Sequence, residues 1–201
     1  MILRSIDEVA AAIPAGDRVI AGIVGAPGAG KSTIAAQLVE TLPSAALLPM
    51  DGYHLPQARL VELGRRDRMG APDTFDVAGF VSTLRSLRFS GETVLAPGFD
   101  RAIEEPVPAA VAIPPENRVV VVEGNYLLLD SGGWEAVAPL LDVTFFVELD
   151  RATRVERLVA RHVRFGKTPD AAAAWALGPD EANAVVIGAT AARADHRIRL
   201  D

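Results

Sequence analysis

The chain has 201 residues, half of them hydrophobic, and is long enough for one α/β domain with a sizeable core. It carries 26 acidic and 20 basic residues, and the net charge of −6 argues against a nucleic-acid partner held by general phosphate neutralisation. There is no cysteine, which excludes disulfides, thiolate catalysis and cysteine-based zinc sites.

The N-terminal residues lack a charged segment followed by an apolar core, and no apolar run is long enough to cross a bilayer. We therefore expect a cytoplasmic protein without a membrane partner. The acidic balance favours a small-molecule substrate over nucleic acid. The sequence leaves the oligomeric state open, with a homodimer as one alternative.

The first predicted elements are a short helix, a strand and a longer helix. Ser5 and Glu8 have the spacing of a capping box, which predicts a helix that stops near Pro14. An apolar run at 19–24 predicts a strand, and residues 33–42 have a helical composition. A second short strand is predicted at 45–50.

The segment between the first strand and the long helix fills every fixed place of G-x-x-x-x-G-K-[ST], the phosphate-binding P-loop. Its glycines let successive backbone N–H groups point inward, Lys31 reaches the outer phosphates, and the Ser32 hydroxyl can bind Mg²⁺. The alternative, a glycine-rich turn that binds nothing, is disfavoured by the strand before it and the helix after it, whose N-terminus attracts anions. The predicted nucleotide-binding residues are Gly25, Ala26, Pro27, Gly28, Ala29, Gly30, Lys31, Ser32 and Thr33.

The middle of the chain is more irregular. A polar, arginine-rich stretch at 59–68 precedes a predicted helix at 76–89. Residues 93–97 and 109–113 are predicted as the two arms of a small hairpin around a loop at 98–108.

Two further strands, at 119–122 and 143–147, are continuous apolar runs, as expected in a parallel sheet that is covered on both faces. Strands that alternate with helices predict a three-layer α/β/α sandwich with a mostly parallel sheet, the P-loop nucleoside triphosphate hydrolase fold. We expect one domain over 1–201, with its ligands at the carboxyl ends of the strands.

Acidic residues follow these strands. Glu123 ends the run at 119–122 and is our candidate for a second contact to Mg²⁺; the alternative is an ordinary carboxylate that caps Asn125. Asp51 ends the strand after the P-loop helix and is the candidate base, the alternative being an Asp-Gly turn. Tyr53 and His54 follow directly, and His54 is a rival base.

An arginine-rich helix is predicted after the last of these strands. Arg154, Arg157 and Arg161 are spaced to share one helical face, which can close over a triphosphate as a lid at about 151–167. The alternative is a solvated helix in which Glu156 pairs with the arginines.

Taken together, these motifs resemble those of the P-loop kinases grouped with uridine kinase, phosphoribulokinase and bacterial pantothenate kinase. The resemblance covers nearly the whole chain, through residues 25–32, 51–54, 70–76, 99–101 and 122–126 and the lid. It is closest to the bacterial branch named nucleoside kinase-like or fructose-transport-system kinase (fructokinase-like). The pyrimidine-recognition segments of uridine kinases are not evident, so no substrate name is transferred.

The resemblance implies that Lys31 and Ser32 hold ATP and Mg²⁺, that Glu123 serves the metal, and that Asp51 is the base or orients the hydroxyl. Arg157 and Arg161 of the lid and Lys31 of the P-loop would then be the further catalytic residues. The residues implied to face the acceptor are Tyr53, His54, Asp100, Arg101 and Tyr126.

The leading hypothesis is therefore an ATP-dependent kinase that phosphorylates a hydroxyl of a small metabolite, either a sugar such as fructose or a nucleoside- or pantothenate-like alcohol. Its main alternative is a regulatory P-loop NTPase or GTPase, because residues 130–133 match the D-x-x-G switch pattern. Against that alternative, the chain has no Asn-Lys-x-Asp guanine motif. A nucleotide-binding module without catalysis is a third reading.

Overall fold

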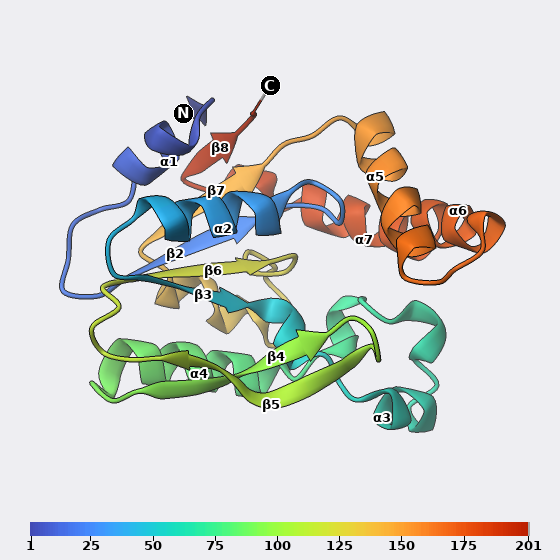
Figure 1. Ribbon diagram of the computed structural model, residues 1–201, viewed down its shortest axis with the longest axis horizontal. Coiled ribbons are helices and arrows are strands. Elements are labelled where there is room, and N and C mark those ends of the chain that lie inside the picture. Colours follow the sequence, from blue (N-terminus) through green and yellow to red (C-terminus); the bar gives the residue numbers. More distant parts are fainter. Residues whose placement is uncertain (201) are drawn as a thin grey trace.

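Six parallel strands form the centre of the molecule, in the order β1-β8-β7-β2-β6-β3. The computed structural model describes residues 1–200, so residue 201 of the predicted domain lies outside the described residues. The strands are β1 (Ile2–Leu3), β2 (Val19–Val24), β3 (Ala45–Pro49), β6 (Val119–Gly124), β7 (Val143–Val147) and β8 (His196–Ile198). In Figure 1 the arrowheads of β2, β3 and β6 point toward α5 (Arg151–Arg164), α6 (Pro169–Leu177) and α7 (Pro179–Gly188).

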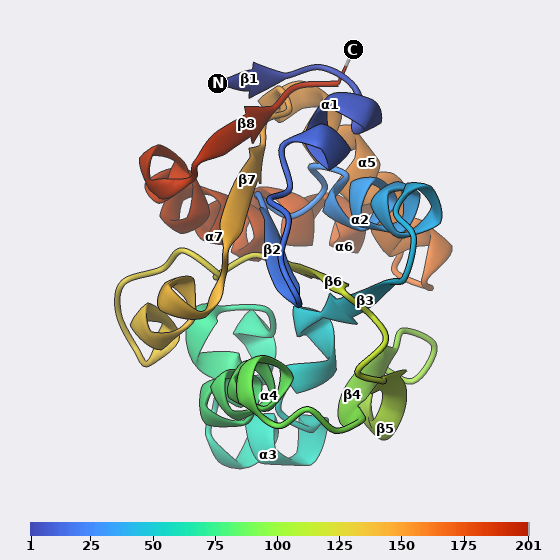
Figure 2. The same cartoon turned by 90° about the vertical axis from the view of Figure 1, so that its left-hand side faces the viewer.

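Helices cover both faces of this sheet, which confirms the predicted α/β/α layering. On one face α1 (Ile6–Ala11) and α2 (Lys31–Thr41) pack on a core that includes Ala21, Ile23 and Val121. On the other, α4 (Val77–Phe89), α7 and the 3-10 helices η4 (Trp134–Ala136) and η5 (Ala138–Leu140) cover a core that includes Ile20 and Val120 (Figure 2). Neighbouring residues of one strand thus enter opposite cores, which explains why these strands are apolar throughout.

Several helices begin at side-chain caps. The Ser5 hydroxyl accepts from the backbone N–H of Glu8 at 3.2 Å, as the capping-box spacing indicates. Asp76 caps α4, and Thr168 caps α6. The remaining short elements are α3 (Gln57–Glu62) and the 3-10 helices η1 (Met50–Tyr53), η2 (Arg66–Arg68), η3 (Pro72–Thr74) and η6 (Ala191–Arg193).

A two-stranded antiparallel hairpin lies beside the sheet, made of β4 (Val94–Asp100) and β5 (Glu105–Ile113). The predicted hairpin is confirmed, but its loop is only 101–104, not 98–108. The prolines and the glycine that suggested a loop are accommodated inside the strands, because each strand of a two-stranded ribbon has one unpaired edge and the register shifts between Ala96 and Gly98.

Close backbone packing joins this hairpin to η1, the segment that carries Asp51. A Cβ on Gly52 would lie 2.1 Å from the carbonyl oxygen of Pro97. Only glycine therefore allows β4 to approach η1 so closely.

None of the helices within residues 1–200 is both long and apolar enough to span a membrane.

We expect Gly52→Ala to lower the free energy of unfolding by about 3 kcal/mol, because the new methyl group meets backbone that cannot rotate away. Urea unfolding measures this change. Gly188→Ala is the matched control, since a Cβ there meets nothing within 4 Å. Equal stability of both variants would contradict the packing described for Gly52.

Candidate functional site

The P-loop connects β2 to α2 and has the conformation that its glycines permit. Gly28 and Gly30 have positive φ angles of 81° and 94°, and Gly30 is the residue that precedes α2. Lys31 opens the helix with its side chain buried, and its ammonium donates to the carbonyl oxygen of Ala26 at 3.2 Å. The loop, the lysine and the N-terminus of α2 thus converge on one point, the arrangement that binds phosphate.

Helix α5 packs directly on this loop. A Cβ on Gly28 would lie 2.8 Å from both the backbone oxygen of Arg154 and the Cγ of Leu158. The Arg154 guanidinium donates to the carbonyl oxygen of Pro27 at 3.4 Å and forms an ion pair with Glu181 of α7. It is buried, so it holds the loop against α7 and does not face a ligand with Arg157 and Arg161, contrary to prediction.

The remaining arginines of the predicted face lie nearer to the loop opening. A Cβ on Gly30 would come within 3.6 Å of the Arg157 guanidinium. The alternative of a solvated helix paired through Glu156 is not what the structure shows, since Arg151 and Arg154 both pair with Glu181.

Glu123 lies beside Ser32 because β6 is the parallel neighbour of β2. Ile23 and Glu123 are register partners, and the Ser32 hydroxyl donates to Glu123 Oε1 at 3.2 Å. Burial, reinforced by the negative charge of Asp51, raises the pKa of Glu123. The hydroxyl and the carboxylate are both oxygen ligands, which fit Mg²⁺ when phosphate and water oxygens complete its shell.

Asp51 reaches the same rim from β3, whose residue Pro49 pairs with Glu123 of β6. Its Oδ2 accepts from the Arg101 guanidinium at 2.5 Å. Burial opposes the charge of Asp51, but Arg101, His54 and Lys31 outweigh it and hold the pKa of Asp51 below its usual range. Burial lowers the pKa of Lys31, and the charges of Glu123 and Asp51 partly offset this.

Two cavities meet at this cluster. The first, which we call the Asp51 cavity, has a volume of about 140 Å³ and lies among η1, the hairpin turn, α5 and α7. The second, the P-loop cavity, has a volume of about 540 Å³ and runs between the N-terminus of α2 and α5. The residues that line both are Lys31, Ser32, Arg101 and Arg161.

His54 and Arg101 line the Asp51 cavity, as expected for residues that face an acceptor. The His54 ring stacks on Phe75, with centroids 4.0 Å apart, and lies 5.0 Å from the ring of Phe99. Burial lowers the pKa of His54, Asp51 opposes this, and Arg101 adds to it.

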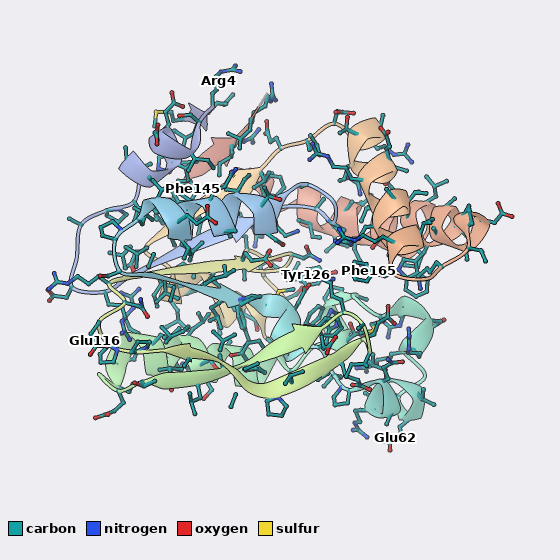
Figure 3. The ribbon with its side chains drawn as sticks, in the orientation of Figure 1. Arg4, Glu62, Glu116, Tyr126, Phe145 and Phe165 are labelled. Atoms are coloured by element: carbon teal, nitrogen blue, oxygen red, sulfur yellow. The ribbon has the colours of Figure 1, made fainter. Side chains whose placement is uncertain are left out.

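Three predicted acceptor contacts do not line this cavity. Tyr53 is buried against Phe80 with its hydroxyl on Thr83 at 2.7 Å, and burial raises the pKa of Tyr53 to about 12. Asp100 is exposed and accepts from the N–H of Ala102 in the hairpin turn. Tyr126 is buried in the core, as its position in Figure 3 illustrates. Each adjoins a residue that does line the cavity, but its own side chain is directed elsewhere.

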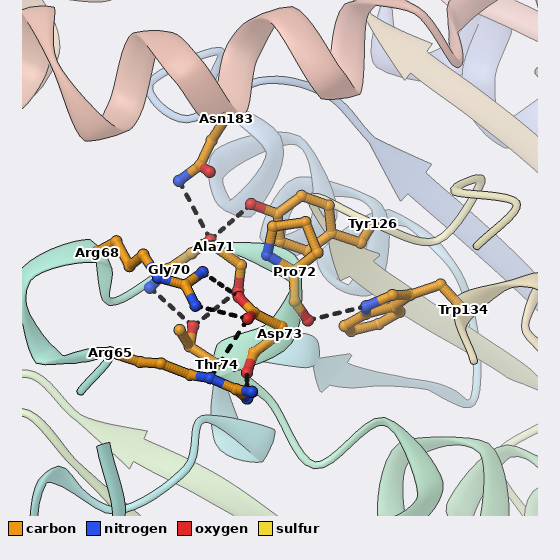
Figure 4. Close-up of polar contacts among 10 residues, drawn as sticks. All are labelled: Arg65, Arg68, Gly70, Ala71, Pro72, Asp73, Thr74, Tyr126, Trp134 and Asn183. Carbon is orange, nitrogen blue, oxygen red and sulfur yellow. Dashed lines mark hydrogen bonds and ion pairs between the residues drawn. The ribbon is translucent and has the colours of Figure 1, made fainter. Parts of the chain in front are cut away.

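Tyr126 instead holds the segment at 70–76. Its hydroxyl donates to the carbonyl oxygen of Gly70 at 2.6 Å, and the Asn183 amide donates to the same oxygen at 3.2 Å (Figure 4). The Trp134 indole donates to the carbonyl oxygen of Pro72 at 3.0 Å. These bonds fix a wall of the Asp51 cavity between α7 and the core.

Sequence reasoning missed much of this cavity wall. The structure adds Arg66, Glu104, Asn125, His162, Lys167, Trp175, Asp180 and Asn183. The arginine-rich composition at 59–68 was a signal for Arg66. No local pattern indicates that α6 and α7 fold back over the strand ends, because this depends on the packing of helices far apart in sequence.

Other predicted features are structural. Asp150 caps α5, and Glu148 pairs with Arg197 and Arg199. Asp130, the acid of the D-x-x-G match, forms an ion pair with Arg193 and lines neither cavity. Residues 130–133 therefore lie apart from the P-loop site.

Comparison with known proteins gives several extended similarities. The ATP-dependent kinase-like protein notR' of Aspergillus versicolor is 46% identical over 133 residues, which cover 62% of this chain and 77% of that protein. A Schizosaccharomyces pombe protein provisionally named a uridine kinase is 34% identical over 163 residues. The match covers 74% of this chain and 68% of that protein. No family model matches.

Among solved structures, a protein from Silicibacter sp. TM1040 provisionally named a fructose transport system kinase is 40% identical. The match covers 90% of this chain and 89% of that one, with a TM-score of 0.83.

The stability of the protein should fall below pH 6.5 because of His54. Its pKa is lower in the folded state than the ordinary value of about 6.5, so the unfolded chain takes up the proton first and folding weakens as the pH falls through that window. We expect a loss of about 1 kcal/mol between pH 7.5 and 5.5, measured by urea unfolding. His54→Phe, which keeps an aromatic ring beside Phe75, should lose this part of the pH dependence. An unchanged pH dependence in the variant would assign the effect to other groups.

Proposed function

Because the chain belongs to the P-loop kinase family that includes uridine kinase and bacterial pantothenate kinase, we propose that it transfers a phosphoryl group from ATP to a hydroxyl of a small metabolite. The observation that carries the proposal is the meeting of the two cavities at Lys31, Ser32, Arg101 and Arg161, with Asp51 and Glu123 beside them. ATP would occupy the P-loop cavity and the acceptor the Asp51 cavity.

The triphosphate would lie on the backbone N–H groups of the P-loop, at the N-terminus of α2. Lys31 would pair with its outer phosphates. A further cavity of about 700 Å³, lined by Thr33, Gln37, Leu149 and Arg157, adjoins the loop and has room for the nucleoside. The glycines at 28 and 30 support this arrangement, since their backbone conformation leaves the loop open to the phosphates.

Ser32 and Glu123 would hold Mg²⁺, and their oxygen ligands and their contact at 3.2 Å support this role. A bound magnesium ion supplies charge neutralisation at the β- and γ-phosphates. The positive charge of the bound ion would keep Glu123 ionised, although burial alone favours its protonated form.

Asp51 would orient the acceptor hydroxyl. Arg101 engages its Oδ2, which leaves Oδ1 for the incoming hydroxyl. The lowered pKa keeps Asp51 ionised, so it acts as a hydrogen-bond acceptor that directs the oxygen lone pair at the γ-phosphorus. The hydroxyl oxygen bonds to that phosphorus as its bond to the β–γ bridging oxygen breaks, ADP leaves, and the hydroxyl proton passes to Asp51.

Arg157 and Arg161 in α5 would supply further positive charge beside the transferring phosphoryl group. Arg161 lines both cavities and Arg157 lines the P-loop cavity, so both can neutralise charge on the transferring group. We propose that α5 with residues 165–167 closes the site as a lid within a single domain. No observation favours the regulatory alternative, because Asp130 pairs with Arg193 away from both cavities.

The proposal is tested by the release of ADP from Mg-ATP in the presence of sugars, polyols, hydroxy acids and nucleosides. Stimulation by one acceptor class supports a kinase. A slow basal hydrolysis that no alcohol accelerates would count against it and favour a nucleotide switch.

Two variants separate nucleotide binding from transfer. Asp51→Asn should bind ATP as the wild type does but transfer phosphate about 10²- to 10⁴-fold more slowly, because the amide cannot take the proton. Lys31→Ala should lose both ATP binding and transfer. Calorimetric titration with ATP and an ADP-release assay measure the two properties. Unchanged transfer by Asp51→Asn would move the role of base to His54.

The arginines of α5 should divide into two groups. Replacing Arg157 and Arg161 together by alanine should lower turnover with little change in stability, because neither forms an ion pair within residues 1–200. Arg154→Ala should lower the free energy of unfolding by about 2 kcal/mol, because it removes a buried guanidinium that binds both the Pro27 carbonyl and Glu181, although Arg151 still pairs with Glu181. Urea unfolding and steady-state kinetics distinguish these outcomes; undiminished turnover by the double variant would leave the lid without a catalytic role.

A further inference from the structure

The chain contains 18 arginines but only two lysines, Lys31 and Lys167, and both lysines line the Asp51 cavity. Lys31 has its place in the P-loop. Lys167 follows α5 and lies far from the P-loop motif in the sequence. Apart from these two lysines and the histidines, every basic residue of the chain is an arginine. A lysine differs from arginine in presenting a compact charge with three rotatable donors, so its presence here calls for a specific partner.

Lys167 is held in place by an aromatic ring and not by a carboxylate. Its ammonium nitrogen lies 4.8 Å from the ring centroid of Trp175 in α6, a cation–π contact. Within residues 1–200 no carboxylate lies within ion-pair distance of this nitrogen. The half-buried ammonium is thus fixed beside the cavity with its hydrogen-bonding capacity unspent.

Most other ionisable groups of the cavity already have a partner. Arg66 pairs with Glu104 at 2.9 Å, Arg101 with Asp51 at 2.5 Å, and His162 contacts Asp180 at 2.7 Å. Lys31, Arg161 and Glu123 adjoin the P-loop cavity or the proposed metal site. Lys167 is therefore the cation on the acceptor part of this wall that has no carboxylate partner within residues 1–200.

Position distinguishes Lys167 from the cations that would meet ATP. It lines only the Asp51 cavity, whereas Arg157 and Arg164 line only the P-loop cavity and Arg161 lines both. An anion bound by Lys167 thus belongs to the acceptor and not to the nucleotide.

We propose that the acceptor is a compact alcohol carrying a carboxylate or phosphate group, and that Lys167, held by Trp175, binds this anion while Asp51 orients the hydroxyl. The inference rests on the proposed kinase function. A cavity of about 140 Å³ limits the acceptor to a small molecule, since a cavity of about 150 Å³ holds one benzene-sized ligand. The product would be a phosphate ester that retains the original anionic group.

Matched alcohols test the requirement for the anion. We would compare glycerate and glycerol phosphate with glycerol by ADP release from Mg-ATP. We expect kcat/KM about 10- to 100-fold higher for the anionic members, the range of one charged hydrogen bond. Comparison of the carboxylates with the phosphates identifies which anion is preferred.

Variants then assign the effect to Lys167. Lys167→Gln should raise the KM of the anionic alcohol about 10- to 100-fold more than it changes the KM of ATP or of a neutral alcohol. Lys167→Arg should recover part of the loss because it keeps the charge. Arg59→Gln, which removes an exposed arginine paired with Glu62 far from the cavity, is the matched control.

The two lysines also allow a test without turnover. Acetylation followed by mass spectrometry reports each lysine separately. A non-hydrolysable ATP analogue should protect Lys31, and the anionic alcohol should protect Lys167, whereas its neutral counterpart should not.

The outcomes separate this inference from the proposed function. Equal turnover of neutral and anionic alcohols, or an unchanged KM in Lys167→Gln, would overturn the role of Lys167 and leave the kinase standing. Failure of every alcohol to accelerate ADP release would overturn the kinase, and the inference with it.

Discussion

The position of β6 between β2 and β3 is the constraint on which the candidate site depends. In a parallel sheet the carboxyl ends of neighbouring strands meet at one edge. The P-loop, Glu123 and Asp51 each follow one of these three strands, and the hydrogen-bonded ladder fixes their relative heights. The separation of the three groups is therefore set by backbone pairing, which is stiffer than any contact among their side chains.

That same edge concentrates charge in a buried place. Asp51 and Glu123 shift in opposite directions because only Asp51 has an arginine directly on its carboxylate. Two adjacent negative charges are unfavourable at this buried edge, so Glu123 takes up a proton more readily than an ordinary glutamate. A cation at Ser32 and Glu123 would stabilise the ionised carboxylate that burial disfavours. Such a site is suited to binding charged ligands more than to stabilising the fold.

The sequence was most informative where function is carried by local spacing. The P-loop and the acids at the carboxyl ends of β6 and β3 could be predicted because the motif and the apolar strand patterns each depend on only a few consecutive residues. Tyr53, Asp100 and Tyr126 were assigned from the family resemblance, which matches short segments, but adjacent side chains in η1 and at the strand ends point in different directions. Asp180 and Asn183 could not be predicted, because they reach the cavity through the tertiary packing of α7.

Arg154 illustrates the limit of helical periodicity. Its spacing to Arg157 and Arg161 is correct, yet Glu181 and the Pro27 carbonyl draw it into the interior. Periodicity identifies a face but not what covers it.

The contact between Gly28 and α5 also bears on how the loop motif itself should be understood. Position 28 is one of the free places in G-x-x-x-x-G-K-[ST], where the consensus accepts any residue. Here the backbone of Arg154 and the side chain of Leu158 leave no room for a methyl group, and φ is +81°. In this protein the packing of α5, and not the phosphate, requires glycine at position 28. The residues that the chain tolerates there are therefore fewer than the motif allows.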